Sequence, residues 1–489
     1  MACSKHEGQD SMSEGENAFM RAEQLGRRSV LIGAAALGLA AACSGPPVGA
    51  LAPESVRTVY GPVVGERRAT GFAFLGVPYA QPPVGELRFA APEPPKPWKE
   101  ALLCTRYGPT AQRKQLSEVT TIPEPVIPGD GILNLNVFTP DPSPSAKLPV
   151  LVWIHGGGFV AGCSASPWYD GASFNRDGVV LVSIGYRLGV EGFLHLSDAP
   201  ENRAVLDWLA ALRWVQGNIA AFGGDPAKVT IAGQSAGGGA VWALMGAPSA
   251  RGLFRAAISE SGALAQPNDR AVAMDMSALF AQRTGTPAKA AAMRDLNRDQ
   301  MQALEDALRA QRPDNPPWLA LGLAPWADGS LIPRASHEML RPGAADAVPL
   351  LLGFTSQEFG DEAQSDAMLR APTYRVAEAR ASQGQPTWLY EFDWPSQAPQ
   401  YRGKSFHCLD VPFAFDLLGA QGVAAVAGDN PPQGLAGAIH GAWVSFVADN
   451  DPGGNWPRYG LDRRETMIWA EEPQVRSDPF ARQRPNWLR

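Results

Sequence analysis

The sequence predicts an α/β fold, in which a mostly parallel central sheet follows an N-terminal antiparallel meander and carries helical insertions. Three observations predict it: short apolar runs without alternation, amphipathic segments between them, and a serine between glycines at the end of one run. Strands without alternation are typical of sheets covered on both faces. Strands that alternate with helices indicate right-handed parallel crossovers.

The chain begins with a segment that predicts export. Arg27 and Arg28 precede an apolar run in "GRRSVLIGAAALGLAAACSG" that is too short to span a bilayer. Paired arginines before such a stretch resemble a bacterial twin-arginine signal. We therefore expect residues 1–47 to be a leader and the protein to be exported, periplasmic or extracellular. "LAAAC" also resembles a lipoprotein-processing site, so a membrane tether through a lipid on Cys43 stays an alternative.

After the leader, residues 48–489 are expected to form one domain. Arg57–Gly85 alternates short β-like runs with Gly and Pro turns, which predicts the antiparallel meander. Six nearly continuous apolar runs then predict buried strands: Leu148–Gly158, Gly178–Arg187, Lys228–Gly233, Ala256–Ser261, Val348–Phe354 and Thr387–Trp394.

Helical periods lie between several of these runs. The segment Glu201–Gly224 places one apolar stripe at helical spacing and Gly223 as a stop; the stripe is Val205, Leu209, Leu212, Val215 and Ile219. A more polar helical stretch, roughly Ala271–Ala310, predicts a helical elaboration around residues 265–345.

Composition excludes several classes of function. The 489 residues are 45% hydrophobic and 19% charged, with a net charge of -7 and only scattered basic residues, so a nucleic-acid partner is not expected. Cys104, Cys163 and Cys408, the cysteines after the leader, show neither CxxC pairing nor metal-ligand spacing. We expect no metal site, at most one disulfide, and buried or free thiols as the better interpretation.

The stretch "VTIAGQSAGGGAV" predicts a nucleophile. Ser235 stands between Gly233 and Gly237, with a strand leading in and a helix leading out. G-x-S-x-G in that context holds the serine on a strained corner at the carboxyl end of a strand. A Cβ at either glycine would crowd the turn.

A serine hydroxyl needs a base, and the chain has 6 histidines. The expected chain order is serine, acid, histidine, which removes those before Ser235. Between Ser235 and His337 there is little sequence that could hold a strand-end acid. His440 lies in an amphipathic segment typical of a packed core histidine. His407, in the loop "GKSFHCLDVPFAF", is the best candidate for the base.

The acid is expected just after a strand and before His407. Glu358 follows the run Val348–Phe354 by a short loop, and it would orient the imidazole. Asp361 and Glu362 are close rivals, although solvated loop carboxylates are the ordinary interpretation for both.

A glycine loop predicts an oxyanion hole. "HGGGF" follows a strand directly, so bare backbone N–H groups can approach a substrate oxygen. The expected donors are the N–H groups of Gly157, Gly158 and Ala236. A phosphate-binding interpretation is weak, because no Gly-Lys-Ser/Thr sequence accompanies the glycines.

These motifs together resemble the type-B carboxylesterase and cholinesterase family of α/β-hydrolases. The resemblance covers nearly everything after the leader: "FLGVPYAQPPVGELRF", "LNVFTP", "VLVWIHGGGF", "NIAAFGGDPAKVTIAGQSAGG", "ISESG", the glutamate loop and "HCLDVPFAF". It implies Ser235 as nucleophile, Glu358 as acid and His407 as base, with the same oxyanion donors. It also implies an acyl-enzyme mechanism on small-molecule carboxylic esters without metal or organic cofactor.

Three departures from the family pattern stand out. Ile132 replaces a cysteine of the usual early disulfide, and Gln234 stands where glutamate is more frequent, which should weaken the negative field at Ser235. Glu358 and His407 are only 49 positions apart, closer than is usual in the family. We expect a more open site that admits bulky or aromatic esters.

Two alternatives to a carboxylesterase stay open. The same site would suit aryl carbamates, amides or synthetic diesters. A non-catalytic, cholinesterase-like binding protein is disfavoured, because such proteins lack a member of the triad and all three candidates are present here.

Overall fold

The computed structural model describes residues 54–487, with gaps at 116–120, 264–266, 311, 313, 316–321, 342, 344–346 and 360–361. The expected leader, with Arg27, Arg28 and Cys43, lies outside the described residues. The division of the chain at residue 47 therefore stays a prediction, as do export and the lipid tether.

The described residues contain one large sheet and one small one. The large sheet is built from β3 (Glu66–Arg68), β4 (Gly71–Pro78), β6 (Asn134–Thr139), β7 (Leu148–Ile154), β8 (Val180–Ile184), β9 (Gly224–Gln234), β10 (Ala256–Glu260), β11 (Leu350–Thr355), β12 (Thr387–Phe392), β13 (Glu465–Trp469) and β14 (Gln474–Ser477). The small sheet contains β1 (Ser55–Arg57), β2 (Pro62–Val64) and β5 (Leu102–Leu103).

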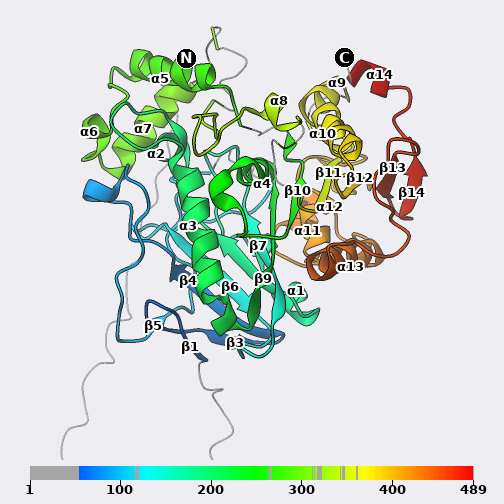
Figure 1. The fold of residues 1–489 in the computed structure, drawn as a ribbon, viewed down its shortest axis with the longest axis horizontal. Helices are drawn as coiled ribbons and strands as arrows, with labels where there is room; N and C mark the ends of the chain where they lie inside the picture. The colour runs from blue at the N-terminus through cyan, green and yellow to red at the C-terminus, as the bar shows by residue number, and fades with distance from the viewer. Residues whose placement is uncertain are drawn as a thin grey trace, which may run out of the picture. The chain divides into compact units, whose positions relative to one another are not determined.

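The large sheet is parallel in its middle and antiparallel at its edges. Within the described part of the chain its order is β14-β13-β12-β11-β10-β9-β7-β8-β6-β4-β3 (Figure 1). Every pairing from β8 through β7, β9, β10, β11 and β12 to β13 is parallel. The predicted α/β fold class is confirmed, and the six predicted runs are β7 to β12.

The N-terminal meander is antiparallel as predicted, but it divides between the two sheets. β1 pairs with β2 in the small sheet, whereas β3 and β4 extend the edge of the large one. The sequence prediction included neither β6 among the buried runs nor the C-terminal hairpin of β13 and β14.

Helices cover both faces of the large sheet, which explains the absence of alternation. α3 (Arg203–Asn218) and α4 (Ala236–Gly246) cross one face (Figure 1), where Val150 and Val152 of β7 share their core. Leu151 and Trp153 of the same strand instead pack in a second core with α1 (Ala172–Arg176), α11 (Val411–Ala414) and α13 (Gln433–Asp449).

The predicted helix over Glu201–Gly224 is present as α3, continued by a 3₁₀ turn over Ile219–Phe222. Its whole predicted stripe is buried. Gly223 ends it with φ +82°, a left-handed conformation that favours glycine.

The other helices surround this framework. The stretch expected to be helical around 265–345 contains α5 (Arg270–Thr284), α6 (Ala290–Met293), α7 (Arg298–Arg309) and α8 (Ser336–Met339). Elsewhere lie α2 (Gly189–Phe193), α9 (Glu362–Ser365), α10 (Ala371–Ser382), α12 (Val423–Ala427) and α14 (Arg484–Trp487), with short 3₁₀ turns at Gly85–Leu87, Pro167–Tyr169 and Pro248–Ala250 and a π turn at Asp366–Arg370.

Cys104, Cys163 and Cys408 are all buried free thiols, which confirms that interpretation of the sequence. Among the described residues, no helix combines the length and apolar character needed to cross a bilayer.

Candidate active site

Ser235 lies at the corner where β9 ends and α4 begins. Its φ is +56°, a conformation that costs energy in a residue with a Cβ. The corner is closed by the Ser235 N–H, which donates to the Glu260 carbonyl at 2.8 Å. The side chain is half-buried at the carboxyl edge of the sheet.

The two flanking glycines are required sterically. A Cβ on Gly237 would lie 1.9 Å from the carbonyl oxygen of Ile154, and one on Gly233 would lie 2.4 Å from the Gly237 carbonyl carbon. The backbone of the corner therefore packs directly against β7, as the motif predicts.

Glu358 and His407 are joined directly. The imidazole Nδ1–H donates to Glu358 Oε2 at 2.5 Å, and the His407 N–H donates to the Glu358 carbonyl at 3.1 Å. The other carboxylate oxygen accepts from the Ser261 hydroxyl at 2.6 Å and the Thr355 N–H at 2.8 Å. This fully paired carboxylate is 2% exposed and fixes both the tilt and the tautomer of the ring.

The rival acids differ in their placement. Asp361 lies outside the described residues. Glu362 is exposed in α9 and lies 3.9 Å from Arg370, and no described contact joins it to the imidazole.

The other two histidines after Ser235 lie in different surroundings. His440 of α13 is buried, with Nδ1 donating to the Ala414 carbonyl at 2.8 Å and Nε2 3.1 Å from Asp177. His337 is exposed in α8. Both placements agree with the elimination from the sequence.

His407 Nε2 does not contact Ser235 through a hydrogen bond in the described structure. In the neutral ring, where Nδ1 carries the proton and donates to Glu358, Nε2 accepts instead from the Gln234 side-chain amide at 3.2 Å. The side-chain oxygen Oε1 of Gln234 is buried and has no hydrogen-bond partner among the described residues. Gln234, one residue before the predicted nucleophile, thus occupies the position on the ring where the serine hydroxyl was expected.

The surroundings shift the pKa of His407 in opposite directions. Burial by itself lowers this pKa, but Cys408 and Glu358 outweigh it and hold the pKa well above its ordinary value. Burial also raises the pKa of Cys408, so that thiol is neutral at pH 7. The Glu358 carboxylate is therefore the charge that stabilises the imidazolium.

Two further carboxyls lie behind this pair, and the sequence analysis did not single them out. Glu260 accepts from Trp443 Nε1–H at 2.7 Å, and Asp410 accepts from the Tyr390 hydroxyl at 2.9 Å. The second oxygen of each carboxyl has no partner among the described residues. Burial and, to a smaller extent, the charge of Asp410 raise the pKa of Glu260 well above its usual range. Burial and, to a smaller extent, the charge of Glu358 raise the pKa of Asp410 to about 6.

The glycine loop presents backbone N–H groups beside the corner. Gly157 and Gly158 follow β7 with φ of +104° and +60°. Among the described residues, the N–H groups of Gly157, Gly158 and Ala236 make no hydrogen bond. Ala236 is the first residue of α4, where an N–H has no partner within the helix. These N–H groups can stabilise a negatively charged oxygen that forms near Ser235.

Comparison with known proteins places this site in context. The profile of the "Carboxylesterase family" matches residues 52–364 and 360–487. A para-nitrobenzyl esterase of Bacillus subtilis is 35% identical over 88% of this chain and 98% of its own. Carboxylesterase 1D of Rattus norvegicus is 32% identical over 85% of this chain and 89% of its own.

Solved structures are similar over the same extent. A structure titled as a PNB esterase superposes with a TM-score of 0.81 at 33% identity, covering 89% of this chain and 99% of that one. A carboxylesterase of Geobacillus stearothermophilus superposes with a TM-score of 0.76 at 33% identity, covering 88% and 99%.

Proposed function

The chain belongs to the carboxylesterase family and is a carboxylic ester hydrolase, and we propose that Ser235, His407 and Glu358 carry out its reaction. The observation that supports this most strongly is the 2.5 Å contact between His407 and a buried, fully paired Glu358. Glu358 follows β11, and only β10 separates that strand from β9, which ends at the strained Ser235 corner. No other described histidine after Ser235 has a buried carboxylate held in this way.

In the proposed reaction, Ser235 Oγ attacks the ester carbonyl while His407 Nε2 accepts the hydroxyl proton. Glu358 keeps Nδ1 protonated and stabilises the imidazolium. The N–H groups of Gly157, Gly158 and Ala236 hold the oxyanion, each donor being worth about 3 kcal/mol of barrier. The imidazolium then protonates the departing alcohol, and water repeats the sequence on the acyl-enzyme.

The described geometry requires one rearrangement before the first step. His407 Nε2 must exchange the Gln234 amide for the Ser235 hydroxyl. Such exchanges are ordinary, because catalytic hydrogen bonds are often long or misaligned before substrate binds.

For the substrate, we propose esters with a bulky or aromatic group. Support comes from the para-nitrobenzyl esterase relative, which matches this chain over nearly its whole length, and from the short Glu358–His407 spacing that suggests an open site. Purified protein is expected to hydrolyse para-nitrobenzyl esters at least as well as small acetyl esters. Exclusion of the bulky esters would contradict the substrate proposal.

The same assay tests the nucleophile. Ser235→Ala is expected to lose activity on every ester while it keeps the wild-type melting temperature, and Ser382→Ala on the exposed end of α10 is the control. Full activity in Ser235→Ala would reject the assignment. An aryl carbamate in the panel distinguishes the carbamate alternative, which predicts faster turnover of that compound.

We also propose export through the N-terminal segment. Replacing Arg27 and Arg28 by lysine is expected to retain the protein in the cytoplasm. Cys43→Ser distinguishes the two exported forms, because it releases the protein from the membrane fraction only if a lipid is attached at Cys43.

A further inference from the structure

The described residues enclose a cavity of about 810 Å³ beside the Pro167–Tyr169 turn. It lies where the end of β3, the turn Pro167–Tyr169 and the loop after α11 meet, and none of Ser235, Glu358 and His407 lines it. The site proposed for ester hydrolysis therefore does not account for this cavity.

Much of the cavity wall is apolar. Pro123, Pro125 and Pro167 face it together with Leu417, and Ala165 and Ala420 complete the apolar surface. A wall of this kind favours the hydrocarbon part of an organic ligand over a bare ion.

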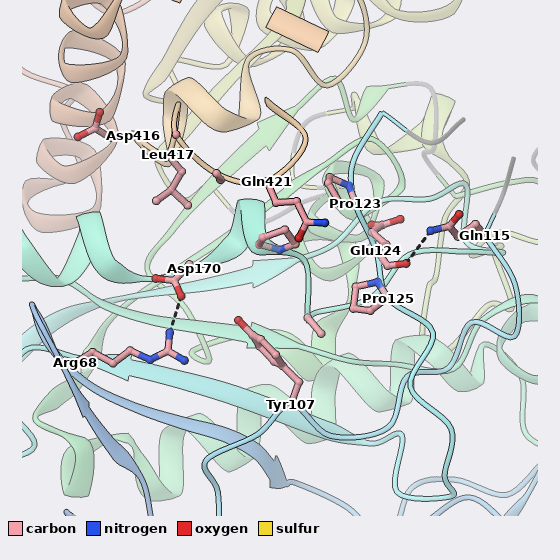
Figure 2. Close-up of a pocket in the computed structure, with 14 residues that line it drawn as sticks. Arg68, Tyr107, Gln115, Pro123, Glu124, Pro125, Asp170, Asp416, Leu417 and Gln421 are labelled. Atoms are coloured by element: carbon pink, nitrogen blue, oxygen red, sulfur yellow. Dashed lines mark hydrogen bonds and ion pairs between the residues drawn. The ribbon is translucent and has the colours of Figure 1, made fainter. Parts of the chain in front are cut away.

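Two of the charged pairs at the cavity are already neutralised. Arg68 donates to Asp170 at 2.6 Å, and Asp416 accepts from Arg176 at 2.8 Å. Figure 2 shows the Arg68–Asp170 pair on one side of the cavity and Glu124 on the other. Neither pair leaves a free cation to attract an anionic ligand.

Glu124 is different, because its carboxyl lines the cavity without a cation. The residue is only 8% exposed, and no described Lys, Arg or His forms an ion pair with it. Its backbone carbonyl, by contrast, accepts from the side-chain amides of Gln112 and Gln115. The loop that carries Glu124 is thus held in place, and among the described residues no cation faces its carboxyl group.

The titratable groups around Glu124 supply no positive charge either. Burial raises the pKa of Glu124 to about 8, and the neutral Cys163 backbone and Tyr169 hydroxyl lower that pKa only in part. Burial, reinforced by Glu124, also raises the pKa values of Cys163, Tyr169 and Tyr186. All three side chains are therefore neutral at pH 7 and supply no counter-charge.

We propose that this cavity binds a primary amine with an apolar body, whose ammonium group pairs with the Glu124 carboxylate while the body lies against the proline-rich wall. An ammonium supplies the counter-charge that the buried acid lacks. An anion would find no free cation, because Arg68 and Arg176 are already paired, and a neutral ligand would form no ion pair with Glu124. The bound state is a non-covalent ion pair, and Glu124 releases its proton to solvent as the pair forms.

Benzylamine and benzyl alcohol test this as matched probes, because they share one apolar body and differ in charge. Calorimetric titration of the full protein at pH 8 is expected to show at least tenfold tighter binding of benzylamine. Below pH 8, its affinity should weaken by up to about tenfold per pH unit. The heats in two buffers of different ionisation enthalpy should report the proton that Glu124 releases.

Two variants and a control locate the binding. Glu124→Gln keeps the shape of the side chain and should remove the preference for the amine without weakening benzyl alcohol. Gly419→Leu should weaken both probes, since Gly419 lines the cavity and a Cβ there meets nothing within 4 Å, which leaves room for a larger side chain to occupy part of the space. The exposed Glu471→Gln should bind as the wild type does.

The proposal is overturned if benzylamine binds both cavity variants as it binds the wild type, or if the two probes bind the wild type equally. Ester hydrolysis is a separate readout, which Glu124→Gln should leave unchanged. Failure of the amine site therefore leaves the hydrolytic proposal standing.

Discussion

Two buried polar clusters in this protein are built in opposite ways. Arg187, in the loop after β8, and Asp207 of α3 are both at most 1% exposed and completely paired. Asp207 Oδ1 accepts at 2.6 Å and Oδ2 at 2.8 Å from the guanidinium, which also donates to the Ala90 carbonyl at 2.7 Å. This paired cluster stabilises the junction between a loop and a helix.

The cluster behind His407 is buried as deeply, yet it keeps unpaired atoms. Glu260 Oε2, Asp410 Oδ1 and Gln234 Oε1 have no partners among the described residues. A buried polar atom left unpaired costs free energy, so its retention needs a reason. Of these two clusters, the completely paired one joins two structural elements, whereas the one that keeps unpaired oxygens lies beside the residues proposed for the chemistry.

The largest effect is expected from Glu358→Gln. It keeps the shape of the side chain but removes the charge that stabilises the imidazolium and can select the wrong tautomer. We expect kcat to fall by about 10³- to 10⁴-fold. Because the carboxylate raises the pKa of His407, the acid limb of the kcat/KM profile should move to lower pH. An unmoved limb would contradict the proposed role of Glu358.

Breaking the Arg187–Asp207 pair should lower the stability of the protein and not change its chemistry. Arg187→Met leaves the buried Asp207 without a partner, and we expect a loss of about 3–5 kcal/mol in the free energy of unfolding. The double variant Arg187→Met/Asp207→Leu should recover most of it. Denaturant-induced unfolding of both variants measures these free energies. A single variant as stable as the wild type would contradict the structural role of this cluster.

Glu260→Gln should make the protein more stable at high pH. A carboxyl whose pKa is raised by folding stabilises fully below its unfolded pKa, and this contribution is lost as pH rises through the folded pKa. Melting temperatures from pH 4 to pH 9 should therefore fall less in Glu260→Gln than in the wild type. Parallel curves would mean that folding does not raise the pKa of Glu260.

The smallest effect is expected from Gln234→Glu. A carboxylate 3.2 Å from Nε2, where the amide now donates, should raise the pKa of His407. The acid limb of kcat/KM should then move up by about one pH unit. Gln234→Met, which has neither the charge nor the amide, should move it less. Identical limbs in the two variants would mean that residue 234 does not act on the imidazole.

The parts of the fold that could be predicted are those determined by local patterns in the sequence. The six buried strands and the Ser235 corner follow from apolar runs and glycine spacing. Strand β6 was not among the apolar runs, because Asn134 and Asn136 interrupt its apolar character, and only the family resemblance indicated it, through "LNVFTP". The Asn136 amide is satisfied only in the folded protein, by the Ser164 carbonyl at 3.1 Å and the Ser183 hydroxyl of β8 at 3.0 Å.

The candidate site was predictable only as far as chain order and motif determine it. The Glu358–His407 pairing agrees with that order. The Gln234 contact with His407 spans 173 positions, and it depends on two side-chain rotamers that no local pattern specifies. The same holds for Glu260 and Asp410. Both lie in motifs quoted for the family, "ISESG" and "HCLDVPFAF", but only tertiary packing brings their two carboxyls together.

The central claim is that Ser235 is the nucleophile made reactive by His407. The most direct test is to label the intact wild-type protein with a fluorophosphonate and map the modified peptide by mass spectrometry. We expect one adduct per chain, on Ser235, and none after unfolding or in His407→Ala. An adduct on another serine, or equal labelling without His407, would contradict the claim.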